Sequence, residues 1–397
     1  MTAAKIYTMS QIPNVTPDLP TDPSVNTLIA RRIRQDVQSM HAYAIQDSAD
    51  MIKLDAMENP HRLPPELQAE LGARLGALAF NRYPDGRVND LRRALAAHAD
   101  MPTGFDIMLG NGSDELISLL AMACDVPVQA GQAKPAVLAP VPGFVMYAMS
   151  AALQGLDFIG VPLTPSFALD VPAMVQRITD QKPAIVYLAY PNNPTANLWD
   201  AGDMALVIAA ARTAGSIVAI DEAYQPFSSR TYLDVIRANP ADHSHVLLMR
   251  TMSKFGLAGV RIGYMMGPAA LVQQVDKLRP PYNISVLNYE CALFALAHQD
   301  VFAAQAADIR TQRGRLLATL GATPGLTVFD SEANMILVRI EGEGAERAQK
   351  VFDGMKSRGV LVKNVSKMHT LLAHCLRLTV GTENENSQMI AALQESL

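Results

Sequence analysis

Two segments of the sequence place reactive types of side chain directly after apolar runs. Lys254 lies in TMSKFGLAG, just past the run 245–250, and Asp221 ends another run in SIVAIDEAY, with Tyr224 three residues later. If these runs are buried strands, both side chains lie at the carboxyl ends of strands, where open α/β sheets hold ligands. Small residues, hydroxyl residues and glycines around Lys254 leave room for a bulky group against its ε-amine. The alternatives are a surface lysine in a loop and a helix-capping carboxylate, a role that Glu222 could fill equally well.

Two further segments could bind polar groups. GNGSDEL (110–116) is a glycine loop that leads into a helix, and the free N–H groups at a helix N-terminus bind anions. An equally good interpretation is that Ser113 caps the helix and the acidic residues lie in its first turn. AYPNNPTAN (189–197) is a third strand end, and its Asn-Pro dipeptides are also typical of an ordinary turn.

Motifs of several other enzyme classes are absent from the sequence. It contains no P-loop, HExxH, GxSxG or complete GxGxxG pattern, which disfavours nucleotide-driven, zincin and serine-hydrolase chemistry. His243 and His245 could ligate a metal, but two histidines in a loop before a strand are more often solvated. We therefore expect no metal site.

The elements that must position the candidate residues alternate between apolar runs and helical segments. The expected strands cover residues 135–140, 157–163, 184–190, 216–221, 245–251 and 261–267, and the expected helices cover 113–124, 145–155, 171–179 and 201–213. The apolar runs are unbroken, which is typical of strands buried on both faces. This alternation predicts βαβ units, a mostly parallel sheet and therefore a three-layer α/β/α domain.

A second, smaller α+β domain is expected after Pro280 and Pro281. Its expected helices cover 286–299, 301–319 and 344–357, and its expected strands cover 326–329, 335–340 and 374–380. The proline-rich start of the chain predicts an irregular arm, followed by a short helix near 24–38. We thus expect three regions. Residues 1–59 form an arm and a helix that pack on the small domain or on a partner subunit. Residues 60–285 form the large domain, and residues 286–397 form the small domain.

Composition limits the class of protein. The chain has 397 residues, of which 49% are hydrophobic and 18% charged, as expected for a globular protein of two or three domains. The net charge is 33 − 38 = −5, which gives no electrostatic basis for binding nucleic acid or an anionic membrane. Three scattered cysteines predict a reducing compartment. The N-terminus is polar, and no stretch of about 18 consecutive apolar residues occurs. We therefore expect no signal peptide and no membrane span, and hence a cytoplasmic protein.

No single motif is specific, but their order along the chain is. A glycine loop before a helix, an aromatic residue after Pro-Gly (Phe144), an Asn-Pro turn, Asp221 with Tyr224, and Ser-x-Lys followed by Arg261 occur in this order. The set resembles the fold-type I pyridoxal-phosphate (PLP) enzymes, specifically the class I and II aminotransferases, over about residues 40–385. The resemblance implies PLP as the cofactor and an α/β fold with a large PLP-binding domain and a smaller domain.

The resemblance assigns roles around the cofactor ring. Lys254 corresponds to the lysine that joins the cofactor aldehyde covalently and later moves a proton at the substrate's Cα. Asp221 corresponds to the aspartate that keeps the pyridine nitrogen protonated, so that the ring can accept electrons. Asn193 and Tyr224 correspond to donors to the ring's phenolate oxygen, and Phe144 to an aromatic residue that stacks on the ring.

The resemblance also implies a phosphate site and a dimer. Backbone N–H groups of Ser113 and Asp114, together with Ser253 and Arg261, would hold the cofactor phosphate, and the Asp114 side chain would have to point away from it. The segment RYPDG matches one whose tyrosine, here Tyr83, reaches the phosphate bound by the other subunit. An active site shared in this way implies an obligate two-fold homodimer.

Within the class, MHAY (40–43), KLDAMENP (53–60), RYPDG and LRLTVGT resemble the histidinol-phosphate aminotransferases of histidine biosynthesis. These enzymes convert histidinol phosphate and 2-oxoglutarate to imidazole-acetol phosphate and glutamate. The resemblance implies that Arg377, in HCLRLTVGT, holds the substrate carboxylate through two hydrogen bonds. Without the resemblance, an arginine on an exposed strand face would be an equal alternative. Tyr43 and Asn59 become candidates for the substrate pocket.

Three positions depart from the pattern of the relatives. Arg261 follows Lys254 by seven residues, one fewer than is usual, and Ala196 replaces the usual glycine after Asn-Pro-Thr. Lys363, in GVLVKN, lies where many relatives have an arginine that helps to bind the phosphate or distal carboxylate of the substrate. A lysine keeps the charge but loses the two-pronged contact of an arginine.

Other functions fit part of the pattern. A PLP-dependent decarboxylase of a phosphorylated amino acid would have nearly the same site, because the bond that is cleaved depends on which Cα substituent is perpendicular to the ring. An aromatic or broad-range amino-acid aminotransferase is a second alternative. A non-enzymatic binding protein on this fold is disfavoured, because such a protein would be expected to lack Lys254.

Overall fold

A computed structural model describes residues 23–39, 46–125, 134–342, 344 and 346–397. These residues belong to two compact units, Met1–Asp47 and Ser48–Leu397. The described part of the first unit holds α1 (Pro23–Arg32) and α2 (Gln35–Gln38), which confirm the helix expected near 24–38 and divide it in two. All the elements that follow lie in the second unit.

The centre of the second unit is a seven-stranded sheet with the order β2-β8-β7-β6-β5-β3-β4. The strands are β2 (Phe105–Gly110), β3 (Ala136–Val141), β4 (Asp157–Pro162), β5 (Ile185–Ala189), β6 (Ile217–Asp221), β7 (Val246–Thr251) and β8 (Gly263–Pro268). Among the described pairs of this sheet, only those that β8 makes with β2 and β7 are antiparallel. The expected mostly parallel sheet is confirmed, although the sequence pattern misses β2.

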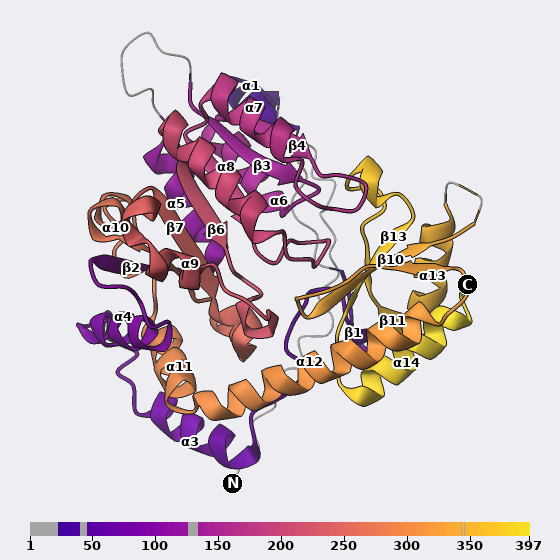
Figure 1. Cartoon of the computed structure of the whole chain (residues 1–397). Helices are drawn as coiled ribbons and strands as arrows, with labels where there is room; N and C mark the ends of the chain where they lie inside the picture. Colours follow the sequence, from indigo (N-terminus) through magenta and orange to yellow (C-terminus); the bar gives the residue numbers. More distant parts are fainter. Residues whose placement is uncertain (1–22, 40–45, 126–133, 343, 345) are drawn as a thin grey trace. The chain divides into compact units, whose positions relative to one another are not determined.

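The two faces of this sheet belong to two different hydrophobic cores. One core joins strand residues such as Val186, Val218 and Leu248 to α4 (Arg87–His98), α7 (Val171–Gln181) and α8 (Ala201–Ala214). The other joins the alternating residues Ile185, Ala219 and Leu247 to α5 (Ser113–Ala123), α6 (Val145–Gln154) and α10 (Ala269–Asp276). Because successive side chains of a strand point to opposite faces, the sheet lies between two helical layers, and the expected three-layer α/β/α architecture is confirmed (Figure 1).

The edge strand β4 departs from the expected burial on both faces. Its residues Asp157, Gly160 and Pro162 are exposed, and only Val161 is buried. An edge strand has one neighbour instead of two, so part of its surface remains in contact with water. The unbroken apolar run therefore predicts the strand correctly but overestimates its burial.

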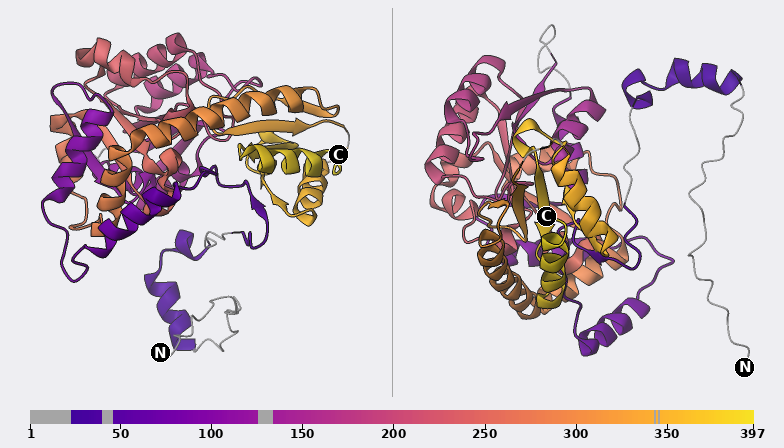
Figure 2. Two further views of the ribbon diagram at one scale, coloured as in Figure 1. Left: turned by 90° about the horizontal axis from the view of Figure 1, so that it is seen from below. Right: turned by 90° about the vertical axis from the view of Figure 1, so that its right-hand side faces the viewer.

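A second, antiparallel sheet has the order β12-β13-β10-β9. Its strands are β9 (Leu326–Val328), β10 (Met335–Ile340), β12 (Lys363–Asn364) and β13 (Cys375–Thr379). Buried side chains of α12 (Gln299–Gly321), α13 (Arg347–Ser357) and α14 (Glu383–Gln394) pack in its core. Figures 1 and 2 show α12, in orange, extending from α11 (Val286–Ala297) to this sheet.

The expected smaller α+β part is therefore present. Because Ser48–Leu397 form one compact unit, the boundaries at residues 59/60 and 285/286 stay predictions. The helix α11 packs on α3 (Pro65–Gly76) and on α4, beside the large sheet. In the described part of the chain, no helix combines the length and apolar character needed to cross a membrane.

The segment before α3 is tied to the small sheet. β1 (Ile52–Lys53) pairs in parallel with β11 (Val360–Leu361). The Met57 N–H donates to Thr379 Oγ1 at 3.2 Å, and Asn334 Nδ2 donates to the Met57 carbonyl at 3.0 Å. These contacts place the backbone around Met57 next to the carboxyl ends of the strands in the large sheet, where it lines the candidate site.

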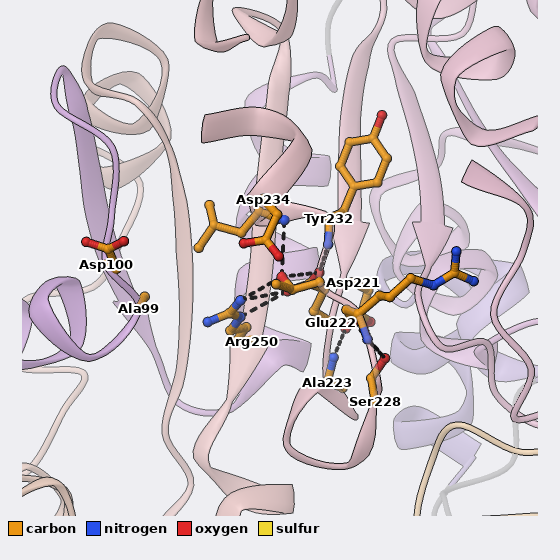
Figure 3. Close-up of polar contacts among 12 residues, drawn as sticks. Ala99, Asp100, Asp221, Glu222, Ala223, Ser228, Tyr232, Asp234 and Arg250 are labelled. Carbon is orange, nitrogen blue, oxygen red and sulfur yellow. Dashed lines mark hydrogen bonds and ion pairs between the residues drawn. The ribbon is translucent and has the colours of Figure 1, made fainter. Parts of the chain in front are cut away.

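A buried ion pair joins the carboxyl ends of β6 and β7 (Figure 3). Arg250 Nε and Nη2 donate to Glu222 Oε2 at 3.0 and 2.9 Å. The side chains of Arg250 and Glu222 are 8% and 1% exposed, respectively. Glu222 Oε1 also accepts hydrogen bonds from the Thr231 hydroxyl at 2.8 Å and from the Tyr232 N–H at 2.5 Å. The pair thus stabilises the strand end that carries Asp221.

We expect Arg250→Leu to lower the free energy of unfolding by about 3–5 kcal/mol, because it leaves the Glu222 carboxylate buried without a cation. The matched control is Arg212→Leu, which removes an exposed ion pair with Asp242 and should cost about 1 kcal/mol or less. Urea denaturation measures both changes. A loss for Arg250→Leu no larger than that for the control would contradict the expectation.

Candidate active site

The carboxyl ends of β5, β6 and β7 open into a cavity of about 330 Å³. This volume lies within the range of small-molecule pockets, about 300–1000 Å³. The cavity is lined by residues that the sequence analysis singled out, namely Ser113, Asp114, Phe144, Asn193, Asp221, Tyr224, Ser253, Lys254 and Arg261. The structure therefore brings together side chains that are as much as 148 positions apart in the chain, from 113 to 261.

Asp221 ends β6 and is 4% exposed. Its Oδ2 accepts a hydrogen bond from the Tyr147 hydroxyl at 2.7 Å, and its Oδ1 accepts one from the Ala223 N–H at 3.0 Å. Burial raises the pKa of Asp221 to about 6, whereas the two hydrogen bonds act in the opposite direction. Above that pH the side chain is a negative charge in the wall of the cavity.

The helix-cap interpretation of Asp221 is wrong. The segment after β6 is a single 3-10 turn, Gln225–Phe227, whose N-cap is Tyr224 and which has no side-chain cap. Glu222 is not interchangeable with Asp221 either, because it binds Arg250 while Asp221 binds Tyr147. The two neighbouring carboxylates therefore serve different parts of the structure.

Lys254 follows β7 in a single π-helical turn, Ser253–Leu257. Gly256 in this turn has a φ of +135°, and a Cβ there would lie 2.9 Å from the Phe302 ring. Glycine is required at this position, because other residues rarely adopt this φ and have no space for a side chain. The glycine that the sequence places near Lys254 thus shapes the turn that carries the lysine.

The environment of Lys254 favours a neutral amine. Its Nζ donates a hydrogen bond to the Ala56 carbonyl at 3.0 Å. Burial lowers the pKa of Lys254 to about 8, and the positive charges of Arg377 and Arg261 act in the same direction. The surface-lysine interpretation is wrong, and near pH 8 about half of the amine is in its nucleophilic form.

The start of α5 forms one wall of the cavity and can hold an anion. The helix begins at Ser113 and its N-cap is Gly112, with φ +78°, so the interpretation of Ser113 as the cap is wrong. A Cβ on Gly263 would lie 2.6 Å from the Gly112 carbonyl carbon, and a Cβ on Gly112 would lie 2.5 Å from Arg261 Nη2. Arg261 Nη1 also lies 3.4 Å from Ser253 Oγ. N–H groups, a guanidinium and a hydroxyl thus meet at one point, as anion binding requires.

The expectation that Asp114 points away from this anion site is wrong. Its Oδ2 lies 3.7 Å from Arg261 Nη2, because the opposite charges attract. Burial raises the pKa of Asp114, while Arg261 and Lys254 act in the opposite direction. An anion bound at the start of α5 would compete with Asp114 for the guanidinium.

Arg377 connects the small sheet to the cavity wall. Its Nη1 donates to Asn193 Oδ1 at 2.8 Å, and Asn193 Nδ2 donates to the Tyr224 hydroxyl at 2.9 Å. Its Nη2 donates to the Asp55 carbonyl at 2.7 Å. At 7% exposure, Arg377 is buried, so the exposed-strand interpretation is wrong. Burial raises the pKa of Tyr224, so this hydroxyl remains protonated and can donate its hydrogen.

Tyr147 is a site residue that the sequence motifs do not reveal. This tyrosine lines the cavity one helical turn after Phe144, and the two rings meet edge to face with centroids 5.6 Å apart. Its ring stacks on Tyr187 with centroids 4.4 Å apart and an interplanar angle of 4°. The i, i+3 spacing of two aromatic residues at a helix start is the signal that could have found it.

Tyr83 and Asn59 are predicted residues that do not line the cavity. Tyr83 is 78% exposed and stacks on Tyr282 with ring centroids 4.6 Å apart. Asn59 lines a neighbouring space, and its Nδ2 donates to Gln305 Oε1 at 2.9 Å. Glu58 lines both that space and the cavity, so Asn59 is one residue from the cavity wall.

The remaining predicted residues are Lys363 and Tyr43. Lys363 lies on β12 directly opposite Arg377 of β13. Opposite residues of an antiparallel pair share a face of the sheet, so Lys363 is on the face that Arg377 presents to Asn193. Tyr43 lies outside the described residues.

Comparison with known proteins identifies the family of this site. Residues 49–393 match the family described as aminotransferase class I and II. The chain belongs to this family. The fold and class that the motifs resemble are thus confirmed.

Two class I and II aminotransferases that resemble the chain are named histidinol-phosphate aminotransferase. The one from Polaromonas naphthalenivorans (strain CJ2) is 65% identical over 96% of this chain and 99% of its own. The one from Paracidovorax citrulli (strain AAC00-1) is 64% identical over 92% of this chain and 97% of its own. Among solved structures, the histidinol-phosphate aminotransferase from Sinorhizobium meliloti in complex with pyridoxal-5'-phosphate has a TM-score of 0.77 and 26% identity, and covers 92% of this chain and 97% of that one.

We expect the reactivity of Lys254 with acetic anhydride to rise with pH through a midpoint near pH 8, where half of its amine is neutral, and to level off at higher pH. In Arg377→Gln the midpoint should move to higher pH, because removing a positive charge stabilises the protonated amine and raises its pKa. Mass spectrometry of the Lys254 peptide measures both profiles on protein freed of bound small molecules. A wild-type midpoint near the ordinary lysine value, about 10.4, would contradict the assigned environment.

Proposed function

We propose that the chain is a PLP-dependent aminotransferase that transfers the amino group of L-histidinol phosphate to 2-oxoglutarate, which gives imidazole-acetol phosphate and L-glutamate. The observation that carries the proposal is the single cavity that joins Lys254, Asp221 and the start of α5. Membership of the class I and II aminotransferases supports the reaction. The names of the relatives at 65% and 64% identity support the substrate.

The residues of the cavity fit PLP in three respects. Its phosphate fits the start of α5, where the glycines leave the N–H groups accessible beside Arg261 and Ser253. Its ring nitrogen fits the Asp221 carboxylate, and its ring face fits Phe144. When bound, PLP supplies an aldehyde carbon conjugated to a ring that accepts electrons.

Lys254 would act twice. As a neutral amine it would hold the cofactor covalently, and its lowered pKa provides that neutral form. When the substrate amine takes its place, the freed amine would accept the proton from the substrate's Cα and return it to the former aldehyde carbon. The Ala56 carbonyl, 3.0 Å from Nζ, orients the amine.

Three side chains would control the ring's charge. Asp221 would hold the proton on the ring nitrogen, where its negative charge stabilises the pyridinium. The Tyr224 hydroxyl accepts a hydrogen bond from Asn193 and keeps its own hydrogen to donate to the ring oxygen. Such donors stabilise the negative charge of that oxygen, which leaves the ring nitrogen as the protonated site.

Arg377 would bind the substrate's anionic end. A guanidinium pairs well with the carboxylate of glutamate and with the phosphate of histidinol phosphate, so one residue can serve both half-reactions. Lys363, which shares a face of the small sheet with Arg377, would add positive charge but no second bidentate contact. Asn59 and Tyr43 remain proposed contacts of the imidazole-bearing part of the substrate.

A homodimer with shared sites is the assembly that we propose. The exposure of Tyr83 and its stacking on the half-exposed Tyr282 leave both rings available to a second copy. In that copy Tyr83 would reach the cofactor phosphate. The cytoplasm is the compartment that we propose, because Cys124, Cys291 and Cys375 are all free thiols, as is typical of a reducing environment.

We expect Lys254→Ala to fold and to lose transamination by at least about 10³-fold, together with covalent retention of the cofactor, because both depend on its amine. Glutamate formation from histidinol phosphate and 2-oxoglutarate measures activity, and borohydride reduction followed by mass spectrometry measures the covalent bond. Lys350→Ala, an exposed lysine on α13, is the control. Normal turnover in Lys254→Ala would overturn the proposed function.

Tyr83→Phe should raise the dissociation constant of PLP about tenfold without dissociating the dimer, because it removes one hydrogen bond to a charged group. Tyr282→Phe keeps the ring stack and is the control, for which we expect less than about a twofold change. Fluorescence titration measures affinity, and sedimentation measures assembly. Equal affinities in the two variants would count against a shared site.

A further inference from the structure

The contact between Tyr147 and Asp221 goes beyond the roles proposed above. Tyr147 lies in the first turn of α6, and its hydroxyl donates to Asp221 Oδ2 at 2.7 Å. The Ala223 N–H donates to the other carboxylate oxygen at 3.0 Å. Both oxygens of Asp221 are therefore held in place, one by a side chain and one by the backbone that follows β6.

Tyr147 itself is fixed by its neighbours. It is 2% exposed, its ring lies parallel to that of Tyr187 at 4.4 Å, and Phe144 meets it edge to face at 5.6 Å. The ring therefore has no room to rotate out of the layer between α6 and the sheet. Burial and the nearby charge of Asp221 raise the pKa of Tyr147, so the hydroxyl stays neutral and acts as a donor.

Other charged groups near Asp221 act against its ionisation. Asp114, on α5, and Glu222, the next residue in the chain, are both like charges that raise its pKa, in addition to burial. The hydrogen bonds from Tyr147 and Ala223 are the contacts that favour the ionised form. Of these two donors, the tyrosine hydroxyl can be removed without changing the backbone, whereas removal of the Ala223 N–H would require proline.

We propose that Tyr147 is a positioning residue for the cofactor's ring nitrogen: it holds the Asp221 carboxylate in the orientation and the charged state in which Asp221 can pair with a protonated pyridine. This inference rests on the proposed use of PLP. A merely structural Tyr147 would affect the fold and any ligand of the cavity alike, whereas a positioning residue affects only ligands that have a ring nitrogen.

The test compares Tyr147→Phe with Tyr187→Phe. Tyr187 is the stacked partner, is 1% exposed, and has its hydroxyl 3.4 Å from the Ile117 carbonyl, a partner other than Asp221. Each variant loses one buried oxygen and keeps its ring. Affinity is measured for PLP and for the PLP analogue whose ring nitrogen is replaced by a C–H group, and thermal unfolding of the cofactor-free proteins reports on the fold.

We expect Tyr147→Phe to weaken PLP binding at least about tenfold and binding of the C–H analogue less than about twofold. Tyr187→Phe should change both affinities by less than about twofold. In an Asp221→Asn background, Tyr147→Phe should have no further effect on PLP affinity, because the partner charge is gone. This double-mutant cycle also tests the proposal if Tyr147→Phe alone proves less stable than the wild-type protein.

If Tyr147→Phe lowered the affinity for PLP and for the analogue equally, the proposal would be overturned. A loss of PLP affinity no larger than that of Tyr187→Phe would also overturn it. An additive effect of Tyr147→Phe and Asp221→Asn would overturn it too. If the wild-type protein bound neither PLP nor the analogue, the proposed function itself would fail, and that result is distinct from the preceding ones.

Discussion

The burial of the Asp221 carboxylate is the constraint on which the centre of this molecule depends. An ionised carboxylate removed from water is destabilised unless hydrogen bonds replace its hydration. The replacement comes from Tyr147 on α6 and from the backbone at Ala223, and Glu222 is neutralised separately by Arg250. These contacts require β6 to lie inside the sheet, between β5 and β7. The sheet order thus supports a negative charge in a cavity, where charges interact more strongly than in water.

The positive charges of the site are Arg261, which lines the cavity, and Arg377, which hydrogen-bonds to the lining residue Asn193. Arg261 sits against the start of α5, which the close approach of Gly112 and Gly263 makes possible. Arg377 comes from the small sheet and reaches the large one through Asn193. The lowered pKa of Lys254 results from burial together with these two guanidinium groups. A single arrangement of positive charge therefore favours anionic ligands and also favours a neutral, nucleophilic amine.

Much of the fold could be predicted because buried strands give unbroken apolar runs. The strand β2 escaped prediction because Asp106 separates Phe105 from the other apolar residues, which leaves an apolar run of only three residues, Ile107–Leu109. The reversed direction of β8 could not be read from its own sequence, because direction depends on the connection to β7. The contacts Tyr147–Asp221 and Arg377–Asn193 join residues 74 and 184 positions apart, so no local spacing reveals them. The direction of the Asp114 side chain depends on its attraction to Arg261, which is distant in the sequence, so the local sequence does not reveal it.

The most direct test of the central claim is a single-turnover absorbance measurement on the PLP-loaded protein. The protein is mixed in turn with L-histidinol phosphate, L-glutamate and L-phenylalanine, and the products are identified. We predict that the visible band of the cofactor is converted to that of its amine form by histidinol phosphate and by glutamate, and at least about tenfold more slowly by phenylalanine. Fastest conversion with phenylalanine, release of carbon dioxide, or no change in the band would contradict it.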